Sequence, residues 1–200
     1  LDLENSGLDV LISAAGIYGS FPVTSADPSL FSRIMDVNLH GTVNLVQALL
    51  GPLTKNHGRV VVISSESYKV QAMFQPYMIS KAALESYCKV ARQELALKGV
   101  KMIVVRPGAM KTGLLKWMES PDFASSYPEF NDELRKSWKS SVKMVGKIAA
   151  PAKVARRIYH AASTRRPRRV YCIKNSFLVS LVSLLPDSVL DWLMVRLFKK

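Results

Sequence analysis

Residues 59–64 read RVVVIS, a short run of apolar, mostly β-branched residues. A run of this length predicts a strand that is buried on both faces of a parallel sheet. Residues 76–97 follow and open on a proline, which is well placed in a first helical turn and predicts a long helix. Residues 100–106 (VKMIVVR) predict a second strand, which a Pro-Gly pair ends.

Strand-like and helix-like segments also alternate on both sides of this stretch. The alternation predicts an α/β fold, with a doubly wound, Rossmann-like parallel sheet that carries helices on both faces. The chain begins at Leu1 within what reads as a helix end, so we expect an N-terminal piece to precede it. The outer segments are a strand at 8–13, a helix at 27–50 that Gly51 and Pro52 break before a short extension to 56, a helix at 151–162 and a strand at 169–173.

The composition is that of a globular protein with a sizeable core. Apolar residues make up 48% of the 200 residues, which excludes a disordered or collagen-like chain. Two cysteines, Cys88 and Cys172, cannot form a disulfide scaffold, and we expect both to be small buried residues in a reducing compartment. The three histidines are too scattered to suggest a zinc site, so no metal is expected.

The net charge of +13 is concentrated near the C-terminus. Residues 151–200 contain eleven Lys and Arg against two Asp, whereas residues 1–50 carry a net charge of −4. A uniformly basic nucleic-acid-binding protein would not show this asymmetry, so no nucleic acid is expected as a partner. Next to an apolar tail, the basic residues favour contact with an anionic lipid surface. The alternative is a solvated face that only aids solubility.

The apolar tail, residues 174–200, has two parts. The run FLVSLVSLL at 177–185 is too short to span a hydrocarbon core, which needs about twenty residues. After Pro186, apolar residues fall largely on one side of a predicted helix with basic residues at its end, which favours a helix lying on a membrane interface. A helix that covers the substrate pocket or a subunit interface is the alternative. We expect an intracellular protein, cytoplasmic or peripheral on an intracellular membrane.

Residues 110–145 differ from the rest of the chain. They mix aromatic residues with charges, Ser and Pro, and show no clean helical or strand period. A long aromatic insert after a strand predicts a lid or a substrate wall. The alternative is a poorly ordered surface excursion.

Polar residues follow the predicted strands or interrupt the predicted helices. Ligands bind at the C-terminal ends of parallel strands, where Ser64 and Ser65 stand. Tyr77 and Lys81 lie four residues apart and share one helix face. A lysine ammonium and the helix dipole would lower the phenol pKa from about 10, so that Tyr77 can exchange a proton with an alcohol oxygen. Asn38 is unfavourable inside its apolar helix, where it would cap a kink or bond to a neighbouring strand.

Four motifs stand in order along the chain. They are Asp36-Val37-Asn38 with Gly41, Ser65 twelve residues before Tyr77, Tyr77-Met-Ile-Ser-Lys81, and Pro107-Gly108-Ala109-Met110-Lys111-Thr112. In this order and spacing the chain closely resembles the short-chain dehydrogenases/reductases over about residues 8–115. The spacing is similar to that of the retinol and hydroxysteroid dehydrogenase branch, and it favours Ser65 over Ser64 as the active serine.

The resemblance implies a role for each matching residue. Tyr77 would be the acid/base, Lys81 would bind the nicotinamide ribose, and Ser65 would orient the substrate oxygen. Asn38 would hold a water in the proton relay. The implied cofactor is NAD or NADP, with Pro107, Gly108 and Thr112 at its nicotinamide end and Ala15 and Gly16 by its adenosine ribose. A homo-oligomer is implied as well.

The sequence departs from the family pattern at two places. Ser13-Ala14-Ala15-Gly16 stands where the family has Asn-Asn-Ala-Gly, so the side-chain hydrogen bond of the second Asn is lost at Ala14. The sequence also contains no Gly-rich turn of the kind that cradles a pyrophosphate at a helix N-terminus. The resemblance therefore implies that residues 1–173 are the C-terminal two-thirds of a Rossmann-type oxidoreductase domain that lacks its first strands.

Together these features predict an NAD(P)-dependent oxidoreductase that interconverts an alcohol and a ketone or aldehyde. We expect an apolar or lipid-like substrate, by analogy with the family. One alternative is a catalytically inert remnant that binds a membrane or a partner. Another is a nucleotide-sugar epimerase or dehydratase, which can share Tyr-x-x-x-Lys, although the Pro-Gly-x-x-x-Thr segment argues against it.

Overall fold

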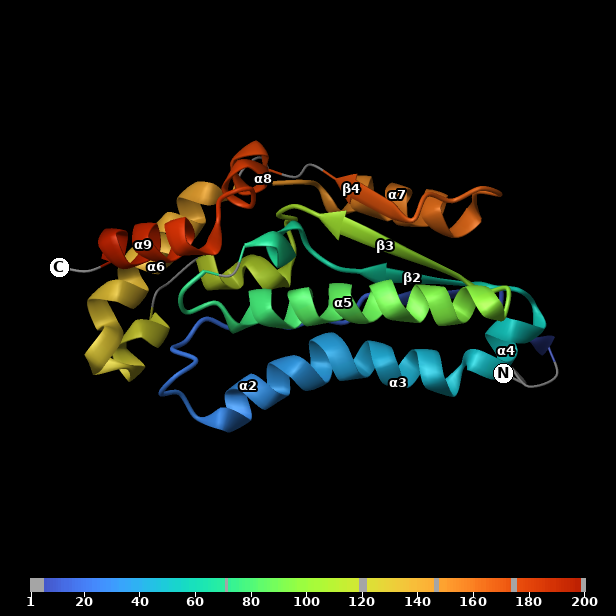
Figure 1. Ribbon diagram of the computed structural model, residues 1–200, viewed down its shortest axis with the longest axis horizontal. Helices are drawn as coiled ribbons and strands as arrows, with labels where there is room; N and C mark the ends of the chain where they lie inside the picture. The colour runs from blue at the N-terminus through green and yellow to red at the C-terminus, as the bar shows by residue number, and fades with distance from the viewer. Residues whose placement is uncertain (1–5, 71, 119–121, 146–147, 174–175, 199–200) are drawn as a thin grey trace.

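Four parallel strands form the sheet in the computed structural model, which describes residues 6–70, 72–118, 122–145, 148–173 and 176–198 (Figure 1). Each strand pairs with the next along the chain, so that Val61 lies between Ile12 and Ile103. The predicted α/β fold with a parallel sheet is confirmed. The strands are β1 (Val10–Ser13), β2 (Arg59–Ile63), β3 (Lys101–Pro107) and β4 (Val170–Ile173).

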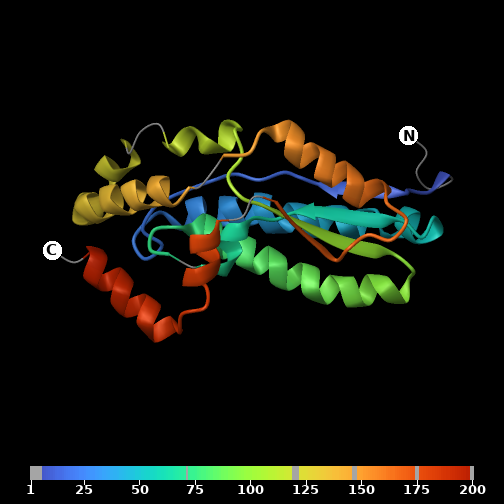
Figure 2. The ribbon, with the colours of Figure 1, turned by 90° about the horizontal axis from the view of Figure 1, so that it is seen from above.

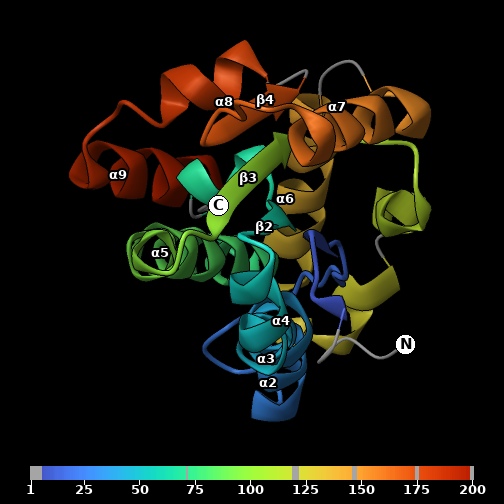
Figure 3. The same cartoon turned by 90° about the vertical axis from the view of Figure 1, so that its right-hand side faces the viewer.

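Helices cover both faces of the sheet (Figures 2 and 3). Helix α5 (Pro76–Leu97) packs on one face with α3 (Gly41–Ala48) and α4 (Leu50–Lys55) beside it, and α7 (Pro151–Ser163) covers the other. Val60 and Val62 of β2 join the core under α5, whereas Val61 joins the core under α7. Alternate strand residues point to opposite faces, so a strand covered on both sides is apolar at consecutive positions.

The helix predicted at 27–50 is divided into pieces. Helix α2 (Pro28–Met35) begins after Asp27, whose carboxylate accepts a hydrogen bond from the Ser29 N–H, and a π-helical turn, η1 (Asp36–His40), joins it to α3. The predicted break at Gly51 and Pro52 is wrong, because the chain leaves the helix at Leu49 and re-enters it in α4. Pro52 lies in the first turn of α4, where a missing N–H costs no hydrogen bond.

The insert after β3 is more regular than its sequence suggests. It forms short 3₁₀ helices and then a longer α-helix, which the irregular spacing of its apolar residues did not predict. Phe123, Tyr127 and Phe130 pack with Phe74 and Leu134 in a small core of their own. The insert is therefore fixed against the loop that precedes α5. Its elements are η3 (Gly113–Met118), η4 (Asp122–Ser126), η5 (Pro128–Phe130) and α6 (Asn131–Met144).

Two helices, α8 (Phe177–Val182) and α9 (Asp187–Phe198), form the tail that follows β4. Helix α8 contacts η2 (Glu66–Lys69), the turn after β2, and the Ser176 N–H donates a hydrogen bond to the Glu66 carboxylate. Helix α9 lies beside α6 (Figure 1), where Lys136 Nζ donates to the Phe198 carbonyl at 3.4 Å. No helix within the described residues is long and apolar enough to cross a bilayer.

Three expectations about where the tail residues, the arginines and the cysteines lie are wrong. Apolar side chains lie on both sides of α9, since Leu190 and Leu193 are half-buried while Val189 and Trp192 are exposed. The arginines between 165 and 169 lie at the opposite end of the molecule from α9, because β4 runs between them (Figures 1 and 2). Cys88 is buried as expected, but Cys172 is exposed, because alternate residues of β4 face away from α7.

Replacing Gly58 by Ala should lower the free energy of unfolding by about 1–3 kcal/mol, the usual cost of overpacking. A methyl group at Gly58 would overlap the backbone carbonyl oxygen of Leu8 and force β1 away from α4. Gly51→Ala is the matched control, because no described atom lies within 4 Å of the added methyl. Denaturant unfolding measures both variants, and equal midpoints would contradict this account.

Candidate active site

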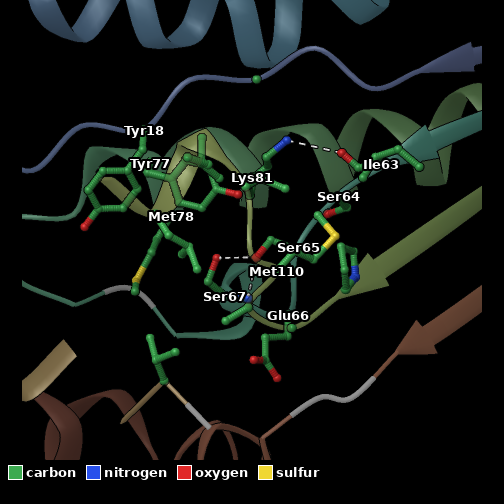
Figure 4. A pocket seen from close by; sticks show the side chains of 18 of the residues that line it. Tyr18, Ile63, Ser64, Ser65, Glu66, Ser67, Tyr77, Met78, Lys81 and Met110 are labelled. Carbon is green, nitrogen blue, oxygen red and sulfur yellow. Dashed lines mark hydrogen bonds between the residues drawn. The ribbon is translucent and has the colours of Figure 1, made fainter. Parts of the chain in front are cut away.

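A cavity of about 450 Å³ opens at the C-terminal ends of β1, β2 and β3 (Figure 4). Parallel strands place their following loops at one edge of the sheet, which is why three separate loops meet here. Residues 14–16, 63–67 and 107–110 supply these loops. Tyr77, Met78 and Lys81 reach the same cavity from the first turns of α5.

Tyr77 and Lys81 are both almost completely buried in this cavity. The Lys81 ammonium donates a hydrogen bond to the Ile63 carbonyl at 3.2 Å, which ties α5 to the end of β2 (Figure 4). The same nitrogen lies 5.8 Å from the centre of the Tyr77 ring. The tyrosine and lysine that the sequence places on one helix face therefore meet at the ends of the strands.

The two serines after β2 have different environments. The Ser65 hydroxyl acts to lower the pKa of Tyr77, and its Oγ accepts a hydrogen bond from the Ser67 hydroxyl at 2.8 Å. Ser64 continues the pairing of β2 with β3 through its N–H, and its buried Oγ has no hydrogen-bond partner among the described residues. Of the two serines, Ser65 is the one that influences the pKa of Tyr77, and its preference over Ser64 as the active serine stays a prediction.

Burial controls the ionisation of the site. It raises the pKa of Tyr77 to about 12, although the nearby Ser65 hydroxyl opposes this shift. It lowers the pKa of Lys81 to about 8, while the nearby Cys88 and Glu85 oppose the change. The expectation that the Tyr77 pKa falls below 10 is wrong here, because loss of hydration outweighs a lysine whose ammonium is directed at Ile63.

Asn38 lies behind the cavity wall and is fully buried. Its side-chain amide donates to the Ile17 carbonyl at 3.0 Å and to Ser80 Oγ at 2.9 Å, and its oxygen accepts from the Ile17 N–H at 2.8 Å. The side chain thus links η1, the loop after β1 and helix α5. Neither structural alternative is observed as stated, since Asn38 lies in a π-helical turn that has no side-chain cap and bonds to the loop after β1 and to α5 instead of a strand.

The remaining residues that the family resemblance selected also line the cavity. They are Ala15, Gly16, Pro107, Gly108 and Thr112. A Cβ added to Gly16 would lie 3.6 Å from Lys81 Nζ, so glycine keeps the space beside this ammonium clear. The Gly108 N–H donates to the Ile173 carbonyl at 2.9 Å, which fixes the end of β3 against β4.

Several lining residues were not predicted. The Tyr18 ring lies 5.4 Å from that of Tyr77, and its hydroxyl donates to Gln75 at 2.7 Å. Burial raises the pKa of Tyr18, so its phenol stays protonated. Leu114 and Ser141 come from the insert, and Val179 comes from α8. The run of serines after β2 could have indicated Ser67 as a lining residue, but no local sequence pattern indicates that the tail reaches the cavity.

Comparison with known proteins identifies relatives along almost the whole chain. The family described as short chain dehydrogenase matches residues 3–121. Estradiol 17-beta-dehydrogenase 2 of Rattus norvegicus is 27% identical over 98% of this chain, which spans 56% of that protein. The NADPH-dependent 3-dehydrocapnine reductase of Ornithobacterium rhinotracheale is 30% identical over 97% of this chain and 71% of its own. Human retinol dehydrogenase 5 is 28% identical over 98% of this chain and 68% of its own.

Solved structures share the fold. A short-chain dehydrogenase from Streptomyces avermitilis superposes with a TM-score of 0.69 at 22% identity, covering 96% of this chain and 68% of its own. A short chain dehydrogenase from Burkholderia cenocepacia J2315, solved with NADP, gives 0.65 at 21% identity, covering 100% and 77%. The relatives named as estradiol and retinol dehydrogenases agree with the branch that the motif spacing indicated. With its ordered motifs, its parallel sheet and a family match over more than half of its length, the chain belongs to the short-chain dehydrogenase family.

Proposed function

We propose that this chain carries the proton-transfer centre of a nicotinamide-dependent oxidoreductase that interconverts an alcohol and a ketone or aldehyde. The observation that carries the proposal is the meeting of Tyr77, Ser65 and Lys81 in one cavity at the ends of the strands. The relatives named above are dehydrogenases and reductases, which favours this function over the epimerase alternative. NAD or NADP, when bound, supplies the hydride that reduces a carbonyl, or accepts one from an alcohol.

Tyr77 is the proton donor in this proposal. With a pKa of about 12, its phenol is protonated at neutral pH and can give its proton to a substrate oxygen. Ser65 lines the same cavity as this phenol and acts on its pKa, so an oxygen bound between them can be held by both hydroxyls. In the reverse direction, the phenolate form of Tyr77 would take the alcohol proton, and a positive charge nearby would favour that form.

Lys81 would hold the ribose next to the nicotinamide. Its ammonium carries three donors and spends one on Ile63, which leaves two for ribose hydroxyls. The unpaired Ser64 hydroxyl and the space that Gly16 keeps clear fit a polar group entering this part of the cavity. Ala15, Gly16, Pro107, Gly108 and Thr112 would complete the cofactor side, as the family resemblance implies. The water-holding role of Asn38 stays a prediction.

The substrate would be apolar. Met78, Met110, Leu114 and Val179 are among the apolar residues that line the cavity, and Glu66 and Lys81 are the charged residues among its described lining. The relatives named for estradiol and retinol point to the same kind of molecule. We propose residues 110–145 as the substrate lid, residues 1–173 as the oxidoreductase part and residues 174–200 as a tail. The insert supplies part of the cavity wall, which supports the lid over a surface excursion.

The tail is proposed to contact a lipid surface through α9 and the turn before it. Leu184, Trp192 and Leu197 are 79%, 59% and 59% exposed, an unusual density of large apolar side chains. Helices α6 and α9 together carry five basic and four acidic residues, so charge adds little here. Apolar insertion would therefore be the main force, and a second copy of the chain is the competing occupant.

Tyr77→Phe should lower kcat about a hundred-fold or more, the lower range for losing a general acid or base. The variant keeps the ring, so the fold and the contact with Tyr18 should persist. Steady-state assays of the full-length protein with NADH or NADPH and a ketone measure the loss. Near-normal turnover by a folded variant would show that Tyr77 is not the proton donor.

Lys81→Met should stabilise the protein at pH 7 and lose this advantage towards pH 10. A lysine with a folded-state pKa of about 8 against an ordinary 10.5 binds its proton more weakly than in the unfolded chain. This difference lowers the free energy of unfolding by about 3 kcal/mol below pH 8, and the loss fades as the pH rises through 8 to 10.5. Thermal unfolding of both proteins between pH 7 and 10 measures it, and a pH-independent gap would refute the burial account.

Leu184→Glu with Trp192→Glu should reduce co-sedimentation of the full-length protein with lipid vesicles about tenfold or more, since each large side chain contributes about 1.5 kcal/mol or more when buried. Salt should have little effect. Leu97→Glu is the matched control, because Leu97 is 90% exposed at the far end of α5. Wild-type protein that stays in the supernatant while sedimenting as a dimer in the ultracentrifuge would assign this surface to a second copy.

A further inference from the structure

Three side chains behind the active site join the three elements that carry it. Arg106 donates two hydrogen bonds to the Glu85 carboxylate, at 2.8 Å from Nε and 2.7 Å from the terminal nitrogen. The Arg106 guanidinium carbon also lies 4.4 Å from the centre of the Tyr68 ring. Glu85 belongs to α5, Arg106 to β3 and Tyr68 to η2. None of the three is among the described residues that line the cavity.

Each of these side chains is close in sequence to a residue of the proposed site. Glu85 lies one helical turn beyond Lys81, and Tyr68 lies three residues after Ser65. Arg106 comes directly before Pro107 in β3. A shift of any one element would therefore have to break or distort this cluster before it changed the spacing of the site.

The contacts are of a kind that resists such a shift. The side chains of Arg106 and Glu85 are 18% and 9% exposed, so the pair is largely shielded from water. The guanidinium is planar and matches the carboxylate in one orientation, which gives direction as well as attraction. The hydrogen bond to Glu85 raises the pKa of Arg106, which keeps the guanidinium charged. The face of Tyr68 adds a cation–π contact on the loop side.

We infer that Tyr68, Glu85 and Arg106 form a positioning cluster. It holds Tyr77, Ser65 and the Pro107–Gly108 turn at the distances from one another that the reaction requires. The inference rests on the proposed oxidoreductase function. These residues touch neither substrate nor cofactor in this proposal, so they act through the elements that they join. Loss of the cluster should affect the reaction geometry more than the binding of either ligand.

The decisive variant in the full-length protein is Glu85→Leu with Arg106→Met. Replacing both partners leaves no unpaired buried charge, so the variant should fold with a thermal midpoint near that of the wild type. Its kcat should fall about ten- to a hundred-fold, as small misplacements of reacting groups do, while KM for NAD(P)H changes less. A folded double variant with wild-type kcat overturns the inference.

Three further variants sharpen the test. Arg106→Lys keeps the charge but loses the paired hydrogen bonds, so its kcat should fall between those of the wild type and the double variant. Tyr68→Phe keeps the ring and should retain activity, whereas Tyr68→Leu should not. Glu94→Gln is the matched control on an exposed part of α5 and should match the wild type. Loss of kcat in this control equal to that of Arg106→Lys overturns the inference.

Hydrogen exchange separates this inference from the proposed function. An inactive wild-type protein would refute the proposed function, but the linkage between elements would still be measurable. Arg106→Lys should speed amide exchange in residues 65–69, which belong to another element, while Glu94→Gln leaves it unchanged. Unchanged exchange in residues 65–69 on Arg106→Lys shows that the cluster does not link these elements and overturns the inference.

Discussion

The packing of α5 on the sheet is the contact on which the rest of the structure depends. Leu84, Cys88 and Leu95 of this helix share a core with Val60 and Val62 of β2. Burial of these apolar side chains fixes the rotation of α5 about its axis, and close packing leaves that rotation little freedom. The same rotation turns Tyr77 and Lys81 towards the strand ends, so the geometry of the proposed site follows from the core beneath it.

That packing also buries polar groups that would otherwise be hydrated. Asn38 is satisfied by three hydrogen bonds, Lys81 by the Ile63 carbonyl and Glu85 by Arg106. A buried polar group is costly unless it is paired, and here each partner belongs to a different element from the group that it pairs with. The polar network therefore specifies how the elements are arranged, while the apolar core supplies most of the stabilisation. Among the described residues, the Ser64 hydroxyl and Arg92 Nε are buried without a hydrogen-bond partner, and Ser64 lines the cavity proposed for the cofactor.

The tail adds a physical link between the cavity and the outer surface. Helix α8 is held to the turn after Ser65 by the Glu66 carboxylate, and it places Val179 in the cavity wall. Burial raises the pKa of Glu66, and the hydrogen bond from Ser176 opposes that shift. On its other side the same helix leaves Phe177 83% exposed. A membrane or protein surface that binds the exposed side of α8 would therefore contact the helix that forms part of the wall of the proposed substrate pocket.

Local patterns in the chain are enough to predict the strand–helix–strand unit around β2 and the spacing of Tyr77, Lys81 and Ser65. Local periodicity and fixed offsets carry this information, because a buried parallel strand and a long helix each have a characteristic pattern. The remaining properties arise only in the folded protein. Burial set the Tyr77 pKa, long-range contacts gave Tyr68 its partner in Arg106, and β4 separated the basic 165–169 turn from α9. These properties depend on which segments meet in space, and no local pattern records distances between residues far apart in the chain.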